Sequence, residues 1–167
     1  APPTPRGERE ASLDRAVDAI VHLKDISELA VDLAYGSVLF EGEDVAETVF
    51  ELEAEADALQ ERFEVWVLEA AANAAEPGNL RGLLRVASGT ETISDAALEI
   101  SEGVLRGLGT HPVVSEAVEE SDEVIVRVTV DPDSALDGTT LGERAVGTET
   151  GMRVVAIHRA DGSIAPG

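Results

Sequence analysis

The stretch "VAETVFELEAEADALQERFEVWVLEA" (residues 45–70) decides the fold, because its apolar residues recur at alternating spacings of four and three. They are Val45, Val49, Leu52, Ala56, Leu59, Phe63, Trp66 and Ala70. This spacing places them on one stripe of an α-helix. The stretch therefore predicts a long amphipathic helix whose apolar stripe packs against other elements.

Two flanking segments show the same periodicity. The upstream positions are Leu13, Val17, Ile20, Leu23, Ser27, Ala30, Ala34 and Val38. The downstream positions are Leu80, Leu83, Ala87, Ser94, Ala97, Ser101, Val104 and Leu108. Gly42 and Pro77 mark the turns between them. Three long helices with short connections predict an antiparallel bundle over residues 11–109, after a flexible N-terminus of residues 1–10.

The periodicity changes after residues 110–121, which we interpret as a linker. "EVIVRVTV" (123–130) and "MRVVAIHR" (152–159) are rich in β-branched residues and predict strands, and "ADG" predicts a hairpin turn into "SIAPG". Thr139 or Thr140 is a candidate N-cap of a short helix. The predicted fold class is thus α+β, with a small α/β domain over residues 122–167. Because so few strands are not stable alone, we expect the chain to continue or to borrow strands from a partner.

The net charge of the chain limits the classes of molecule that it could bind. The chain has 34 Asp and Glu against 12 Lys and Arg, for a net charge of -22. Such a surface repels nucleic-acid polymers and anionic lipids. Hydrophobic residues make up 44% of the chain, which is enough for a core, but no apolar run could span a bilayer. We therefore expect a cytoplasmic protein with no direct membrane insertion. The acidic, lysine-poor composition resembles that of proteins from extreme halophiles.

Two pairs of carboxylates recur with the same spacing. Glu53 and Asp57 lie four apart in one predicted helix, and Glu91 and Asp95 in the next. Both pairs border an apolar stripe, where like charges destabilise each other. A divalent or iron-type metal ion bound by oxygen ligands from both helices would compensate. The alternative is that these are ordinary solvated acids in a very acidic chain.

No catalytic motif is present, and the chain has no cysteine, so we expect no enzymatic activity. Glu does not stand three residues before His22, His111 or His158, which argues against a ferritin-like di-iron site. We interpret His111 as a structural linker residue and His158 as a packed or surface residue. Tyr35 and Trp66 are expected in the core.

The helical part resembles PhoU domains, some of which bind metal clusters through paired carboxylate motifs. The segments that carry the resemblance are "LKDISELAVDLAYGSVLF" (23–40), "ELEAEAD" (51–57) and "ETISDAALEI" (91–100). The resemblance implies that Glu53, Asp57, Glu91 and Asp95 are the metal ligands.

The C-terminal part is similar to TrkA-C (RCK-C) domains. The residues at matching positions are Ser134, Leu136, Gly138, Thr140, Leu141, Gly151, Val155, Ile157, Arg159 and Pro166. TrkA-C domains form dimers and bind small ligands such as cyclic di-AMP. The resemblance implies a similar ligand here, for which the candidate binding residues are Arg127, Arg153, Ile157 and Arg159.

Together the two resemblances imply a regulatory protein without catalytic activity. The expected function is that of a homodimeric subunit that senses a small ligand and regulates a membrane-embedded cation transporter or channel, which would place it at the membrane periphery. The alternative is a metal-binding, PhoU-like regulator of phosphate uptake. A single PhoU-like unit, where phosphate-system proteins usually have two, favours the potassium-linked branch.

Overall fold

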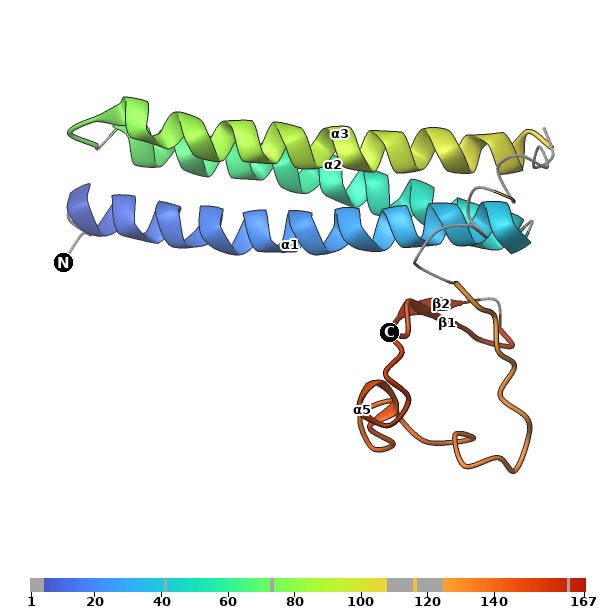
Figure 1. Cartoon of the computed structure of the whole chain (residues 1–167). Coiled ribbons are helices and arrows are strands. Elements are labelled where there is room, and N and C mark those ends of the chain that lie inside the picture. Colours follow the sequence, from blue (N-terminus) through green and yellow to red (C-terminus); the bar gives the residue numbers. More distant parts are fainter. Residues whose placement is uncertain (1–4, 41, 73, 108–115, 117–124, 162) are drawn as a thin grey trace.

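The computed structural model describes residues 5–40, 42–72, 74–107, 116, 125–161 and 163–167. Three long helices, α1 (Pro5–Phe40), α2 (Glu43–Ala72) and α3 (Arg81–Leu105), lie side by side as a bundle (Figure 1). Helix α2 runs antiparallel to both neighbours, and every pair of the three helices is in contact. The predicted antiparallel three-helix bundle is confirmed.

The core of the bundle follows the apolar stripes read from the sequence. In α2 the stripe is buried or half-buried throughout, and Phe63 and Val49 are fully buried. In α1 the stripe was predicted less well, because Val17 is 51% exposed. Tyr35, which was expected in the core separately from the stripe, is also exposed. The predicted core position of Tyr35 is therefore wrong, whereas Trp66 packs at the edge of the core.

The two connections follow the expected turn chemistry. The backbone N–H of Gly42 donates to the carbonyl of Ser37, which closes the end of α1 before α2 begins at Glu43. Pro77 starts the 3₁₀ helix η1 (Pro77–Leu80), where its missing N–H carries no penalty. Helix α1 begins at Pro5, so the later part of the segment expected to be flexible is helical.

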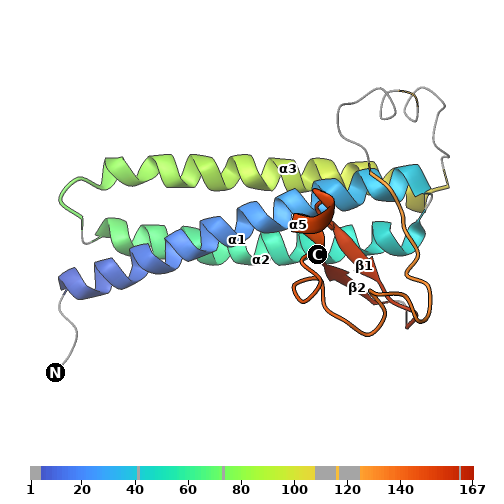
Figure 2. The ribbon, with the colours of Figure 1, turned by 60° about the horizontal axis from the view of Figure 1, so that its bottom comes forward.

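The described residues of the C-terminal part have little regular structure. It contains the short helix α5 (Val146–Thr150) and a two-stranded antiparallel sheet of β1 (Ala156–His158) and β2 (Ile164–Pro166). The register pairs Ile157 with Ala165, which confirms the predicted hairpin. Figures 1 and 2 show this part beside α1 and α2, on the side of the bundle away from α3.

The predicted α/β domain is not found in the described residues. Residues 125–130, expected to form a strand, pair with no other described segment, and Val128 is 75% exposed. A strand needs a hydrogen-bonded neighbour, and the two described strands pair with each other. Thr140 makes a reciprocal, capping-box-like pair of hydrogen bonds with Glu143, but the helix that follows begins later, at Val146. The predicted linker, apart from Glu116, and His111 lie outside the described residues.

Candidate metal centre

Three of the four predicted metal ligands come together. Glu53 and Asp57 of α2 and Asp95 of α3 each place one carboxylate oxygen within 4.8 Å of the others. The four-residue spacing puts Glu53 and Asp57 on the same side of α2, one turn apart. Asp95 reaches them from the neighbouring helix, so the cluster bridges α2 and α3.

Local sequence explains why these side chains are held at the edge of the core. Asp57 directly follows Ala56, and Asp95 directly follows Ser94, both of which are buried in the bundle. The side chain of a residue next to a core position points towards the boundary between two helices rather than towards the solvent-facing side of its own helix. Glu53 is half-buried, whereas Asp57 and Asp95 are exposed and open the cluster to solvent.

The cluster has unfavourable electrostatics. Partial burial, followed by the charges of Asp57 and Asp95, raises the pKa of Glu53 above its ordinary value. Burial and the nearby Glu91 and Asp57 likewise raise the pKa of Asp95. No ion pair joins the three clustered residues to a Lys, Arg or His among the described residues. The negative charge is therefore uncompensated within the described part of the protein.

The fourth predicted ligand, Glu91, is not one of the three clustered residues. Its carboxylate accepts a hydrogen bond of 3.0 Å from the side-chain amide of Gln60 on α2. The other amide atom of Gln60, Oε1, is buried and has no hydrogen-bond partner in the structure. Sequence reasoning missed Gln60, although its position three residues after Asp57 places it on the same side of α2.

The donor set fits a hard divalent cation. Calcium ligands lie about 2.3–2.6 Å from the ion, so two oxygens on opposite sides of it are about 4.6–5.2 Å apart. The three carboxylate oxygens of the cluster all lie within 4.8 Å of one another, so no two of them are too far apart to share one such ion. Carboxylates are the ligands that Ca²⁺, Mg²⁺ and Mn²⁺ prefer.

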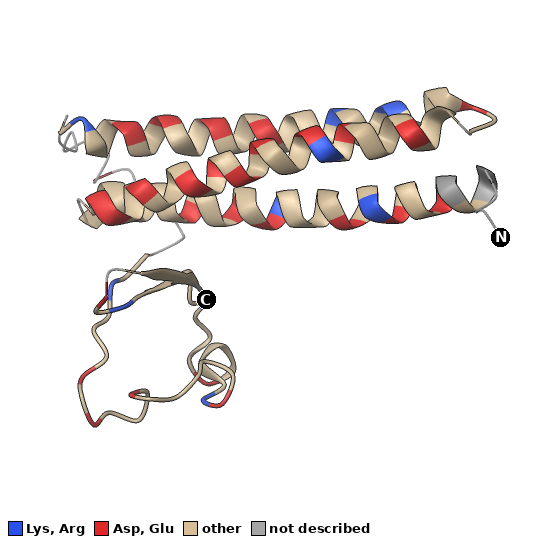
Figure 3. Ribbon diagram, turned by 180° about the vertical axis from the view of Figure 1, so that it is seen from behind, with Lys and Arg blue, Asp and Glu red and all other residues tan. Residues whose placement is uncertain are grey.

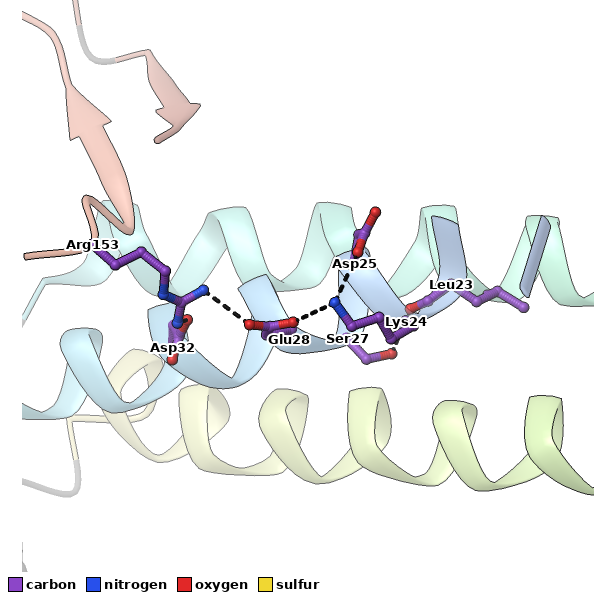
Figure 4. A network of polar contacts seen from close by, with 7 residues as sticks. All are labelled: Leu23, Lys24, Asp25, Ser27, Glu28, Asp32 and Arg153. Atoms are coloured by element: carbon purple, nitrogen blue, oxygen red, sulfur yellow. Dashed lines mark hydrogen bonds and ion pairs between the residues drawn. The ribbon is translucent and has the colours of Figure 1, made fainter. Parts of the chain in front are cut away.

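Another pair with the same spacing lies on α1 and is neutralised. Arg153 Nη1 is 3.0 Å from Glu28 Oε1, and its other terminal nitrogen pairs with Asp32 (Figure 4). Lys24 also approaches Glu28, at 2.7 Å. The hydrogen bond and charge of Lys24, and then Arg153, lower the pKa of Glu28. This pair has the E-x-x-x-D spacing, but Arg153 and Lys24 of the protein itself provide the positive charge that a metal ion would otherwise supply.

The predicted small-ligand residues do not gather at one site. Arg153 donates to Glu28 on α1, and the guanidinium of Arg127 lies 5.0 Å from the ring centre of Phe40. Ile157 is half-buried on β1, and the Arg159 backbone N–H closes the hairpin onto Ser163. His158 is exposed at the surface, where its Nε2 lies 2.8 Å from Asp44 Oδ2. Three side chains, those of Arg127, Arg153 and His158, therefore dock the C-terminal segment on the bundle.

Acidic residues occur along all three helices, with few basic residues among them (Figure 3). No helix in the described ranges is long and apolar enough to cross a membrane. The distribution of acidic residues (Figure 3) agrees with the acidic surface expected from the sequence.

Comparisons with known proteins identify the helical part. The PhoU domain matches residues 20–104, just over half of the chain, and this range contains all four predicted metal ligands. No curated protein matches the sequence. A PhoU domain indicates a regulatory role in phosphate-related transport. The matched residues cover most of α1, all of α2 and nearly all of α3, and on this ground the chain belongs to the PhoU domain family.

Proposed function

We propose that this protein is a non-enzymatic regulator of phosphate-related transport whose bundle binds a hard divalent cation through Glu53, Asp57 and Asp95. The observation that supports the proposal is the approach of three carboxylates from two helices to within 4.8 Å, with no basic partner among the described residues. Burial and then the charges of neighbouring carboxylates raise the pKa values of Glu53 and Asp95, and a bound cation would offset the repulsion between these charges.

The side chains of the cluster would have different roles in binding a cation. A bound cation would supply positive charge that offsets the repulsion between the three carboxylates. Glu53, Asp57 and Asp95 would hold it, and in doing so they would fix α2 against α3. Gln60 orients the Glu91 carboxylate next to the cluster through its 3.0 Å hydrogen bond. Metal occupancy would thereby set the spacing of two helices, which is a signal that a partner protein could read.

Calorimetric titration with Mn²⁺, after removal of metal with a chelator, tests the proposal. We expect saturable binding by the wild type and its loss in D57N/D95N. The matched control is E28Q/D32N, which removes two carboxylates of the same spacing that are paired with Arg153. The control should bind as the wild type does. Equal binding by D57N/D95N and the wild type would refute the site.

The hypothesis of a potassium-linked sensor rests on sequence resemblance alone. Two of its proposed ligand-binding arginines, Arg127 and Arg153, contact the bundle in this structure. A ligand such as cyclic di-AMP would have to compete with these contacts. A thermal-shift titration with cyclic di-AMP tests this prediction, and a rise in melting temperature that depends on ligand concentration would support it.

A further inference from the structure

Helix α3 presents an uncharged face that is exposed from Gly82 to Ala96 and half-buried at Ile100 and Gly103. The residues of this face, which we call the α3 seam, are spaced alternately by four and three: Gly82, Val86, Gly89, Ile93, Ala96, Ile100 and Gly103. The β-branched residues thus occupy every seventh position, and small residues occupy the other positions of the repeat. In a chain with 28% charged residues, none of the seven is charged.

Five of the seven seam residues are open to solvent in the single chain, whereas Ile100 and Gly103 are half-buried and Ile100 also packs against the core of the bundle. Val86 is 56% exposed and Ile93 is 49% exposed, so the large apolar residues of this part of the seam lack a partner among the described residues. A Cβ atom added at Gly82, Gly89 or Gly103 would meet no other atom within 4 Å. Packing among the described residues therefore does not require these glycines. Glycine is nevertheless among the least favourable residues in a helix interior, so a partner that approaches closely would explain the glycines.

We propose that a second copy of this chain covers the seam, with the two α3 helices antiparallel. A spacing of four and three is the repeat of a helix pair, in which the side chains of one helix fit between those of the other. In a parallel pair, large residues would face large ones and glycines would face glycines. In the antiparallel pair, Ile93 faces Gly89 of the other copy, Val86 faces Ala96, and Ile100 faces Gly82.

The charges beside the seam select the same arrangement. Arg85 and Glu99 are exposed on its outer flank, each directly before a β-branched seam residue, and neither forms an ion pair with another described residue. The antiparallel register given above places Arg85 of each copy beside Glu99 of the other, and Thr92 beside Thr92 at the two-fold axis. Moving the pairing by one heptad towards the helix ends would instead bring Arg85 beside Arg106.

The charge distribution of the bundle also shows where two copies could meet. The rest of the bundle surface is strongly acidic, so two copies that met elsewhere would bring like charges together (Figure 3). The seam is an uncharged surface on which they can approach. Added salt should therefore strengthen the dimer, because it screens the remaining repulsion between the copies.

The dimer is independent of the metal site. Asp95 directly precedes Ala96 of the seam but points towards Glu53 and Asp57 on α2, on another side of α3. Variants of the seam should leave Mn²⁺ binding unchanged, and D57N/D95N should leave the dimer intact. Failure of one proposal can therefore be distinguished from failure of the other.

Sedimentation equilibrium of the full chain, at low and high salt, tests the seam. We expect the wild type to have twice the mass of one chain. Gly89→Leu adds bulk at the closest approach and should raise the dimer dissociation constant at least about tenfold. It also improves helix propensity, so it should not unfold the bundle. Ser88→Leu, with similar bulk off the seam, should sediment as the wild type does. A monomeric wild type, or a G89L dimer of unchanged affinity, would overturn the proposal.

Two further variants test the direction of the helices. The chain has no cysteine, so T92C introduces a single thiol, which should form a disulfide between copies under mild oxidation. S88C is the control and should not do so. R85E should weaken the dimer, and R85E/E99R should restore it, because both flanking pairs regain opposite charges. A T92C chain that forms no more disulfide than S88C, or no rescue by E99R, would overturn the antiparallel arrangement.

Discussion

Glu28 and Asp32 on α1, and Glu53 and Asp57 on α2, share one spacing in sequence but differ in their surroundings. Arg153 binds both carboxylates of the α1 pair, and Lys24 adds a second cation. The α2 pair instead faces a further carboxylate, Asp95, from α3. The pKa of Glu28 is accordingly lowered, whereas that of Glu53 is raised.

The difference shows that spacing does not distinguish a metal site from a docking site. A carboxylate pair one helical turn apart offers the same two oxygens in both places. What separates the two pairs is the charge that the rest of the fold brings to them. On α1 the C-terminal segment provides an arginine, and on α2 the neighbouring helix provides more negative charge.

Metal should stabilise the protein through the α2–α3 cluster, and this is the largest effect that we expect. Wild-type protein in Mn²⁺ at about 100 times its dissociation constant should gain about 2.7 kcal/mol in free energy of unfolding over the chelated protein. D57N/D95N should gain nothing. Urea denaturation with and without metal measures the difference, provided that the fitted m-value is unchanged.

The control for this measurement is the α1 pair. E28Q/D32N should gain as much from metal as the wild type, because its metal cluster is intact. If E28Q/D32N also lost the gain, the α1 pair would contribute to metal binding, and the contrast between the two pairs would fail.

Without metal, acidification should stabilise the bundle over a limited range of pH. Because the pKa values of Glu53 and Asp95 are raised, the folded state binds more protons than the unfolded state. Their destabilising effect is complete at neutral pH. It decreases as the pH falls through the raised values, and it ends near the ordinary values of about 4.3 for Glu and 3.9 for Asp.

The expected size of this effect is about 0.5 kcal/mol, because solvent screens these partly exposed groups. Urea denaturation in chelator across this range measures it. Glu53→Gln with Asp95→Asn should remove this part of the pH dependence. A double variant with the same pH profile as the wild type would show that the two groups titrate normally in the folded protein. At lower pH the order reverses, since carboxylates with lowered pKa values, such as Glu28, lose stabilising charge.

The bundle was predictable from sequence because its helices contain repeated local patterns. The α2 stripe specified both the helix and its buried face, and Gly42 and Pro77 marked the turns. The α1 stripe was less exact, because α1 packs against both α2 and α3 and buries residues such as Ala19, Ile26 and Leu33 that were outside the predicted row. Whether residues 125–130 form a strand could not be predicted from their own sequence, because a strand depends on a hydrogen-bonded neighbour elsewhere in the chain.

The metal cluster was partly predictable for the same reason. Helical spacing alone related Glu53 to Asp57, and the resemblance to PhoU domains related them to α3. Neither source separated Glu91, which binds Gln60, from Asp95, which joins the cluster. The docking role of Arg153 was hidden because its partners lie 121 and 125 residues away in the sequence.

Removing Arg153 should weaken the contact between the C-terminal segment and the α1 pair. In R153Q, Glu28 and Asp32 lose the cation that holds the C-terminal segment on α1. We expect amide hydrogen exchange in β1 and β2 to become several-fold faster, with exchange in α2 and α3 unchanged. R159Q is the control, because Arg159 contributes its backbone N–H to the hairpin. Equal exchange in R153Q and the wild type would show that Arg127, His158 and apolar packing are sufficient for docking.

The smallest effect that we expect is a change in one pKa on removal of Lys24, the cation on α1 itself that pairs with Glu28. Lys24 is the first cause of the lowered pKa of Glu28, ahead of Arg153, so K24Q should raise that pKa towards its ordinary value. The carboxylate pKa values can be followed by NMR titration of ¹³C-labelled protein. The pKa of Glu53 serves as the internal control and should not move, because its causes are burial, Asp57 and Asp95. A pKa of Glu28 that stays low in K24Q would mean that Arg153 neutralises the pair alone. The contrast between the two carboxylate pairs would then depend on a single side chain of the C-terminal segment.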